Sequence, residues 1–176
     1  MTALFVYFGI ALSISFLCSI LEAALLSVTP SHLAKLEQDR PKVGARMRAL
    51  KSQIDRPLAA ILSLNTMANT AGAAGVGAQA QSLWGSEALA IASGILTLAI
   101  LVVSEILPKT LGAMYWRRLT GFMVAVLPPM ILLLFPFVWL SEFITRALRR
   151  QRTALTLSRE EFAALAGVGE REGVFD

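Results

Sequence analysis

The stretch "LFVYFGIALSISFLCSILEAALLSV", from Leu4 to Val28, decides the fold class of this chain. It is about 25 residues long, and a helix needs about 20 apolar residues to cross a bilayer. Its only charged residue is Glu22, and no Lys or Arg precedes it. Because the apolar core of a secretory signal is shorter and follows basic residues, we interpret this stretch as a retained transmembrane helix.

Three more apolar segments follow, at residues 58–79, 88–107 and 119–144. Hydrophobic residues make up 56% of the 176 and charged residues only 16%, a balance unlike that of a soluble domain. We therefore predict an all-α integral membrane protein. The single Cys18 and the single His32 exclude a disulfide framework and a cluster of soft metal ligands.

Two regions, 35–56 and 109–171, hold all 16 Lys and Arg residues. With three spans at about 4–28, 58–79 and 88–107, both regions lie on the same side of the membrane. Because Lys and Arg are enriched in cytoplasmic loops, we expect both regions in the cytoplasm and the N-terminus outside. The expected location is the cell (inner) membrane, with several passes.

The interval between the first two spans, at about 31–55, alternates basic and apolar residues. This pattern is typical of amphipathic helices that lie at the membrane interface. We expect two short helices here, separated by Pro41.

The fourth apolar segment contains Pro128, Pro129 and Pro136. Prolines remove helical hydrogen bonds and disfavour helical dihedrals in the residue before them. If this segment crossed the membrane, the basic run after it would face outside. Both arguments favour a proline-kinked juxtamembrane segment at about 112–150 that begins and ends on the cytoplasmic side, with a fourth span as the alternative.

The expected transmembrane domain covers residues 1–152. Residues 153–176 are polar and acidic, and we expect them to begin a linker to a cytosolic domain. The sequence contains no nucleotide-binding loop, catalytic triad or zinc-ligand spacing, so we expect neither an enzyme nor a nucleic-acid-binding protein.

Polar side chains inside the predicted spans gather in three groups. They are Ser15, Ser19 and Glu22 on the first helix, Asn65 and Asn69 on the second, and Ser104 and Glu105 on the third. Ser and Asn in membrane helices often only join helices, whereas carboxylates at membrane depth usually face a cavity, a partner or an ion. Glu105 is the better ligand, because Glu22 lies close to the interface. Pro108 cannot donate to the Ser104 carbonyl, which should therefore be free.

These groups offer carboxylate, amide, hydroxyl and carbonyl oxygens. Such hard ligands suit Mg²⁺, Ca²⁺, Mn²⁺ or Na⁺ rather than copper or zinc. The second span also carries Gly72, Gly75 and Gly77 among alanines, and small residues allow close helix contact. We expect this helix in the protein interior, near a subunit interface.

Three motifs, "SILEAALLS" (Ser19–Ser27), "NTMANT" (Asn65–Thr70) and "SEILPKT" (Ser104–Thr110), resemble the signature stretches of the CorC/CNNM family of Mg²⁺ transporters. Their order and spacing fit as well, and the resemblance covers essentially the whole chain. The tail is similar to that family's lead into a pair of cytosolic CBS domains. The family often has Ser-Gly-Ser-Glu where this chain has "SILE", which leaves one hydroxyl ligand from that motif.

The resemblance implies a homodimer in the lipid bilayer, with three transmembrane helices per protomer, interfacial helices and a belt-like juxtamembrane helix. It also implies Mg²⁺ transport, generally outward and driven by Na⁺ entry, with ATP bound only by the CBS pair after Asp176. Carried over residue by residue, the implied Mg²⁺ ligands are Ser19, Asn65, Asn69, Glu105 and a main-chain oxygen near Gly112. The residue analysis adds Ser15, Glu22 and Ser104 as further candidates.

We therefore expect alternating access around a cation site between the midplane and the cytoplasmic side. The alternative is a membrane-embedded regulator or sensor that binds Mg²⁺ without carrying it. An intramembrane enzyme is disfavoured, because the sequence shows no nucleophile and base in matched positions.

Overall fold

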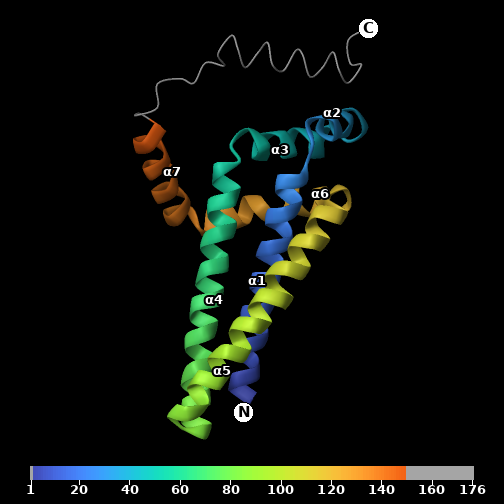
Figure 1. Cartoon of the computed structure of the whole chain (residues 1–176). Coiled ribbons are helices and arrows are strands. Elements are labelled where there is room, and N and C mark those ends of the chain that lie inside the picture. The colour runs from blue at the N-terminus through green and yellow to red at the C-terminus, as the bar shows by residue number, and fades with distance from the viewer. Residues whose placement is uncertain (1, 150–176) are drawn as a thin grey trace, which may run out of the picture. The chain divides into compact units, whose positions relative to one another are not determined.

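A computed structural model describes residues 2–149 of the chain, apart from the side chains of residues 84, 86–89, 92 and 148–149 (Figure 1). All of its elements are helices: α1 (Thr2–Ser27), α2 (Pro30–Asp39), α3 (Pro41–Ser52), α4 (Asp55–Trp84), α5 (Ser86–Ala99), the π-helical segment η1 (Ile100–Ile106), α6 (Leu107–Leu133) and α7 (Phe135–Arg149). The chain divides into two units, Met1–Glu142 and Phe143–Asp176, and the contacts below are those of the first. The predicted linker at 153–176 lies outside the described residues.

Two described stretches, Thr2–Ser27 and Ser93–Leu133, are long and apolar enough to cross a membrane. The first is α1, and the second runs from the end of α5 through η1 and α6. The 30 residues of α4 give it the length for another span, but its Asn, Thr, Gln and Gly residues lower its hydropathy. The all-α prediction is confirmed, and α4 as a third span stays a prediction.

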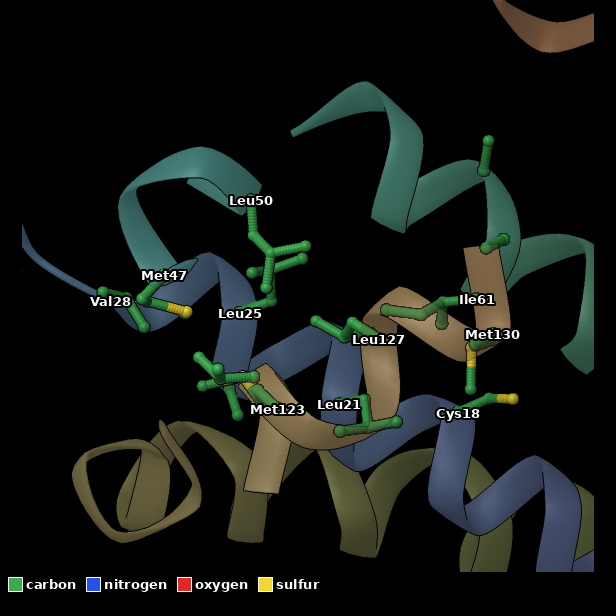
Figure 2. Close-up of a cluster of buried hydrophobic side chains, with 14 of the residues drawn as sticks. Cys18, Leu21, Leu25, Val28, Met47, Leu50, Ile61, Met123, Leu127 and Met130 are labelled. Atoms are coloured by element: carbon green, nitrogen blue, oxygen red, sulfur yellow. The ribbon is translucent and has the colours of Figure 1, made fainter. Parts of the chain in front are cut away.

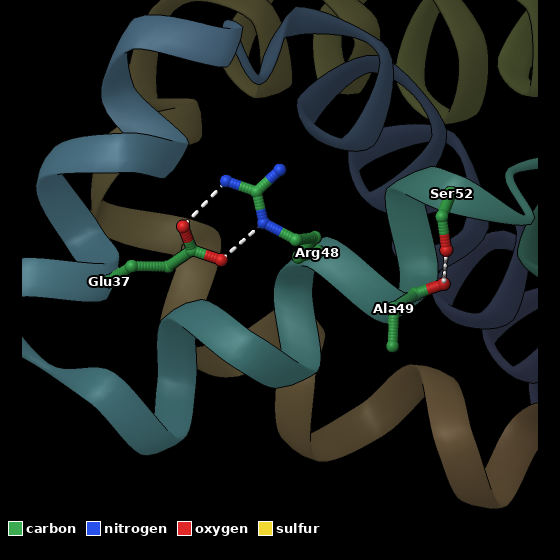
Figure 3. Close-up of polar contacts among 4 residues, drawn as sticks. All are labelled: Glu37, Arg48, Ala49 and Ser52. Atoms are coloured by element: carbon green, nitrogen blue, oxygen red, sulfur yellow. Dashed lines mark hydrogen bonds and ion pairs between the residues drawn. The ribbon is translucent and has the colours of Figure 1, made fainter.

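The interfacial interval folds into the two short helices that the sequence predicts. The Thr29 hydroxyl caps α2 by accepting a hydrogen bond from the His32 N–H at 3.3 Å. α3 begins at Pro41, where a missing N–H breaks no helical hydrogen bond. The Arg48 guanidinium donates two hydrogen bonds to the Glu37 carboxylate and so ties α3 to α2 (Figure 3).

The predicted proline-kinked segment at about 112–150 is broken at two places. α6 changes direction at Tyr115, whose dihedrals (φ −106°, ψ 15°) are not helical, and it continues through Pro128 and Pro129. The next break is at Leu134 (φ −99°, ψ 20°), before α7. Pro128 and Pro129 therefore cause no break in α6, whereas the break at Leu134 lies just before Pro136, the third proline of the predicted kinked segment. We call Trp116–Leu133 the belt segment.

The belt segment packs across the C-terminal end of α1 and the N-terminal end of α4 (Figures 1 and 2). The shared core is built from Cys18, Leu21 and Leu25 of α1, Met47 and Leu50 of α3, Ile61 of α4, and Met123, Leu127 and Met130 of the belt segment. Burying one such large side chain contributes roughly 1.5–3 kcal/mol. This core holds one end of each long helix and positions the polar residues further along them.

Candidate cation site

α1 and α4 pack so closely that glycine is required at their contact. A Cβ on Gly72 would lie 2.3 Å from the Cβ of Ala11, and one on Gly75 would lie 2.8 Å from the Cγ of Tyr7. The contact made nearer the C-terminus of α4 is made nearer the N-terminus of α1, so the two helices are antiparallel. Gly72 and Gly75 thus serve the packing of α4 on α1 within one chain, and a subunit interface near this helix stays a prediction.

This register brings Ser15 near the level of Asn69 and Ser19 near the level of Asn65, one helical turn away. Ala11, Ser15 and Ser19 follow one another at intervals of four on one stripe of α1, and both serines are fully buried. Asn69 and Asn65 lie one and two turns before the glycine contact, on the face of α4 that meets α1. Three of the predicted ligands and the further candidate Ser15 therefore come together at the α1–α4 contact.

Three oxygen atoms at this contact are buried without a hydrogen-bond partner among the described residues: Ser15 Oγ, Ser19 Oγ and Asn69 Oδ1. The Asn69 amide nitrogen donates to Asn65 Oδ1 over 3.5 Å. A buried polar group without a partner costs about 1–3 kcal/mol, and native proteins keep few of them. Oxygens left in this way are suited to accept a cation as their partner.

Other hydroxyls of the same bundle find partners in their own helices. Donation to the carbonyl four residues back is made by Ser27 (to Ala23, 2.8 Å), Thr97 (to Ser93, 2.8 Å), Thr110 (to Ile106, 2.8 Å) and Thr120 (to Trp116, 3.1 Å). This is the usual bond of Ser and Thr inside helices. Ser15 and Ser19 make no such bond, so the structural explanation that suffices for the other hydroxyls does not account for these two.

The segment η1 and the start of α6 lie against α1. The Ser104 hydroxyl donates to the Leu12 carbonyl over 3.3 Å, and a Cβ on Gly112 would lie 2.6 Å from the Ile20 carbonyl oxygen. These two contacts are about two turns apart on both helices and in the same order, so the helices run parallel. Glu105 is partly buried, and its carboxylate makes no ion pair or hydrogen bond with any described residue.

Because η1 is π-helical, the carbonyl that lacks a donor because of Pro108 is not the one that the sequence predicts. The Leu107 N–H donates to the Val102 carbonyl, five residues back. In that register the N–H that Pro108 lacks would have served Val103, one residue before the Ser104 carbonyl that the sequence predicts to be free. π-helical turns are frequent at functional sites, and this one contains Glu105.

Glu22 has a partner that the sequence analysis missed. The Lys109 ammonium lies 3.5 Å from the Glu22 carboxylate, a contact that depends on the parallel register of α1 and α6. No group of three or more His, Cys, Asp or Glu residues occurs in the part of the chain that the structure describes. Of the two acidic candidates, Glu22 thus has its charge compensated by Lys109, whereas Glu105 has no ion-pair partner among the described residues.

The comparison with known families identifies the family of the chain. The family model of the cyclin M transmembrane N-terminal domain matches residues 7–176. The chain belongs to this family. The cyclin M (CNNM) family, which includes the UPF0053 proteins, consists of membrane proteins generally linked to Mg²⁺ transport, and the predicted resemblance is confirmed.

Two relatives show how much of a cyclin M family protein this sequence represents. A UPF0053 protein of Synechocystis is 34% identical over 161 residues, which are 91% of this chain and 46% of the relative. The UPF0053 inner membrane protein YfjD of Escherichia coli is 29% identical over 151 residues, 82% of this chain and 35% of the relative. The chain thus spans less than half the length of these relatives.

Proposed function

We propose that this chain is the membrane domain of a Mg²⁺ transporter that moves the ion outward, coupled to Na⁺ entry, by alternating access. The observation that carries the proposal is the set of three buried oxygens without partners at the α1–α4 contact. Oxygen is the ligand that Mg²⁺ prefers, and the general link of the cyclin M family to Mg²⁺ transport supports this choice of ion.

Each residue of the proposed site has a separate role. Ser19, Asn65 and Asn69 supply neutral oxygens, and Ser15 offers a fourth in the same environment. Glu105 supplies the negative charge that a divalent cation needs. Because Mg²⁺ gives up its water reluctantly, we propose that water fills the remaining positions. A site with one carboxylate binds weakly enough to release the ion, as transport requires.

The third span gives the site a part that can move. η1 departs from α-helical pairing beside Glu105, and discontinuous helices commonly form the ion sites of transporters. Gly112 brings α6 against α1 next to Ser19, so a small shift of α6 would change the site. We propose that this shift alternates access to the two sides of the membrane.

We further propose a homodimer in the bilayer, in which α1, α4 and the helix from α5 to Met114 span and the belt segment lies in the membrane plane. Thr66 and Thr70 are exposed on α4, and a partner subunit would cover this polar face better than lipid. ATP would act only through a CBS pair that follows residue 176.

Flux of Mg²⁺ in proteoliposomes tests the transport proposal. The purified protein should carry Mg²⁺, and an opposing Na⁺ gradient should raise the rate. Asn69→Ala should abolish flux, whereas Thr97→Ala, whose exposed hydroxyl is bonded only to its own helix, should leave it. Mg²⁺ binding without flux would contradict transport and favour a regulator or sensor.

A further inference from the structure

A groove of about 680 Å³ lies between α3, the start of α4 and the belt segment, at the end of the bundle away from the cation site. One wall carries Arg46 and Arg56, and the opposite wall is formed by the apolar belt residues Pro128, Pro129 and Ile131. The groove thus combines basic and apolar surfaces within one binding volume. It also lies where the positive-inside rule places the cytoplasmic face of the bilayer.

The two arginines of the groove differ in how their charge is used. Arg56 donates from Nε to the Glu142 carboxylate and from Nη1 to Gln53 Oε1 at 3.2 Å, so its charge is already compensated. Arg46 is exposed and makes no ion pair or hydrogen bond within the described residues. A guanidinium in this position suits a phosphate, which it binds through two parallel hydrogen bonds.

The belt wall contributes hydrogen-bond acceptors as well as apolar surface. Pro128 and Pro129 have no N–H, so the carbonyls of Val124 and Ala125, four residues earlier, lack their helical donors. For Val124 the residue five positions on is also proline, which excludes a π-type bond as a substitute. Both residues line the groove, so a bound molecule that carries hydrogen-bond donors would replace the helical donors that these carbonyls lack.

We infer that this groove binds an anionic phospholipid of the cytoplasmic leaflet whose headgroup carries hydroxyl groups. The phosphate lies at Arg46, the headgroup hydroxyls donate to the belt carbonyls, and an acyl chain follows Pro128 and Ile131. One lipid molecule supplies a partner for each part of the groove: a negative charge for Arg46, hydrogen-bond donors for the belt carbonyls and an acyl chain for the apolar wall. Basic residues at the cytoplasmic surface attract anionic lipids in general, and the carbonyls add a preference for a headgroup with donors.

Native mass spectrometry of the purified protein tests the site, with dioleoyl phosphatidylglycerol as the probe and dioleoyl phosphatidylcholine as the neutral reference. Phosphatidylglycerol should bind more tightly than phosphatidylcholine, and Arg46→Gln should weaken it about tenfold by removing a charged hydrogen bond. Lys42→Gln is the matched control, because it removes the same charge from the same helix outside the groove. This control should bind phosphatidylglycerol as the unmodified protein does.

A second variant tests the carbonyls without touching the charge. Pro129→Ala restores an N–H that bonds the Ala125 carbonyl within the helix, so phosphatidylglycerol binding should weaken while phosphatidylcholine binding stays the same. Equal losses in Arg46→Gln and Lys42→Gln would overturn the inference in favour of general surface charge. Equally tight binding of soluble glycerol phosphate would assign the groove to a free anion. An altered oligomeric state of Arg46→Gln with lipid binding unchanged would assign it to a second copy of the chain.

Discussion

Ser15 and Ser19 are buried hydroxyls that use neither their own helix nor a neighbouring side chain. Thr120, which is 2% exposed, donates instead to the Trp116 carbonyl. When no ion is bound, the Thr120 hydroxyl stabilises the fold through its hydrogen bond, whereas the Ser15 hydroxyl is buried without one. The effect of removing each hydroxyl on the stability of the protein can therefore be compared in Mg²⁺-free buffer.

We expect Ser15→Ala to leave the thermal unfolding temperature in Mg²⁺-free buffer unchanged or slightly raised, because it removes a buried group without a partner. Thr120→Val, which removes a bonded hydroxyl at similar burial, should cost about 0.5–1.5 kcal/mol. Thermal unfolding of both variants in detergent checks this. A loss in Ser15→Ala as large as in Thr120→Val would show that the Ser15 hydroxyl is already bonded.

The ion pair between α2 and α3 gives a dependence on pH. Hydrogen bonds from Arg48 lower the pKa of the Glu37 carboxyl below its usual value, which is about 4.3. The stabilisation is therefore complete above that pH and is lost as the pH falls through the lower pKa of the folded state. Glu37→Gln should unfold at a lower temperature than the unmodified protein at pH 7, and this difference should disappear at low pH.

Asp39→Asn is the control for this titration, because Asp39 is an exposed carboxylate on the same helix. Asp39→Asn and the unmodified protein should not show a difference in unfolding temperature that disappears as the pH falls. A difference for Glu37→Gln that stays constant from neutral to acidic pH would contradict the assigned role of the pair.

At the scale of helices, the sequence predicts the elements better than their contacts. α1, α2 and α3 follow from apolar length, charge alternation and Pro41, which are local properties. Pro108 and Gly112 predict a disturbed helix in this region, but the exact positions of the π-helical residues 100–106 and of the bend at Tyr115 were not predicted, because both lie a few residues away from these two. The Glu22–Lys109 pair was missed for a related reason, since the register of two helices is set by packing and not by the spacing within either one.

The contact of α6 with α1 predicts opposite effects for two glycines of α6. Gly112→Ala would place a Cβ 2.6 Å from the Ile20 carbonyl oxygen, so the helices must separate at a cost of about 1–3 kcal/mol. Gly121→Ala meets no atom within 4 Å and should stabilise the helix by roughly 0.5–1 kcal/mol. Unfolding temperatures of the two variants check this. A Gly112→Ala variant as stable as Gly121→Ala would show that α6 does not approach α1 this closely.

At the scale of the whole molecule, the distribution of Lys and Arg predicts which ends of the helices face the cytoplasm. In a Cys18→Ala background, a cysteine at Ser82, near the end of α4, should react with an impermeant thiol reagent added to intact cells. A cysteine at Ser52, at the end of α3, should react only after the membrane is opened. Both positions are exposed in the fold, so burial does not explain a difference. Labelling of Ser52→Cys from outside would contradict the proposed orientation.

The central claim is that Mg²⁺ binds between α1 and α4 with help from Glu105, and Mg²⁺-dependent thermal stabilisation tests it most directly. Unfolding temperatures of the unmodified protein, Asn69→Ala, Glu105→Gln and the control Thr97→Ala are measured across a Mg²⁺ titration. Asn69→Ala should weaken the stabilisation roughly tenfold in Mg²⁺ concentration, and Glu105→Gln should weaken it more because it removes the charge. Thr97→Ala should match the unmodified protein. If Asn69→Ala and Glu105→Gln both keep the full Mg²⁺-dependent stabilisation, the cation site is elsewhere.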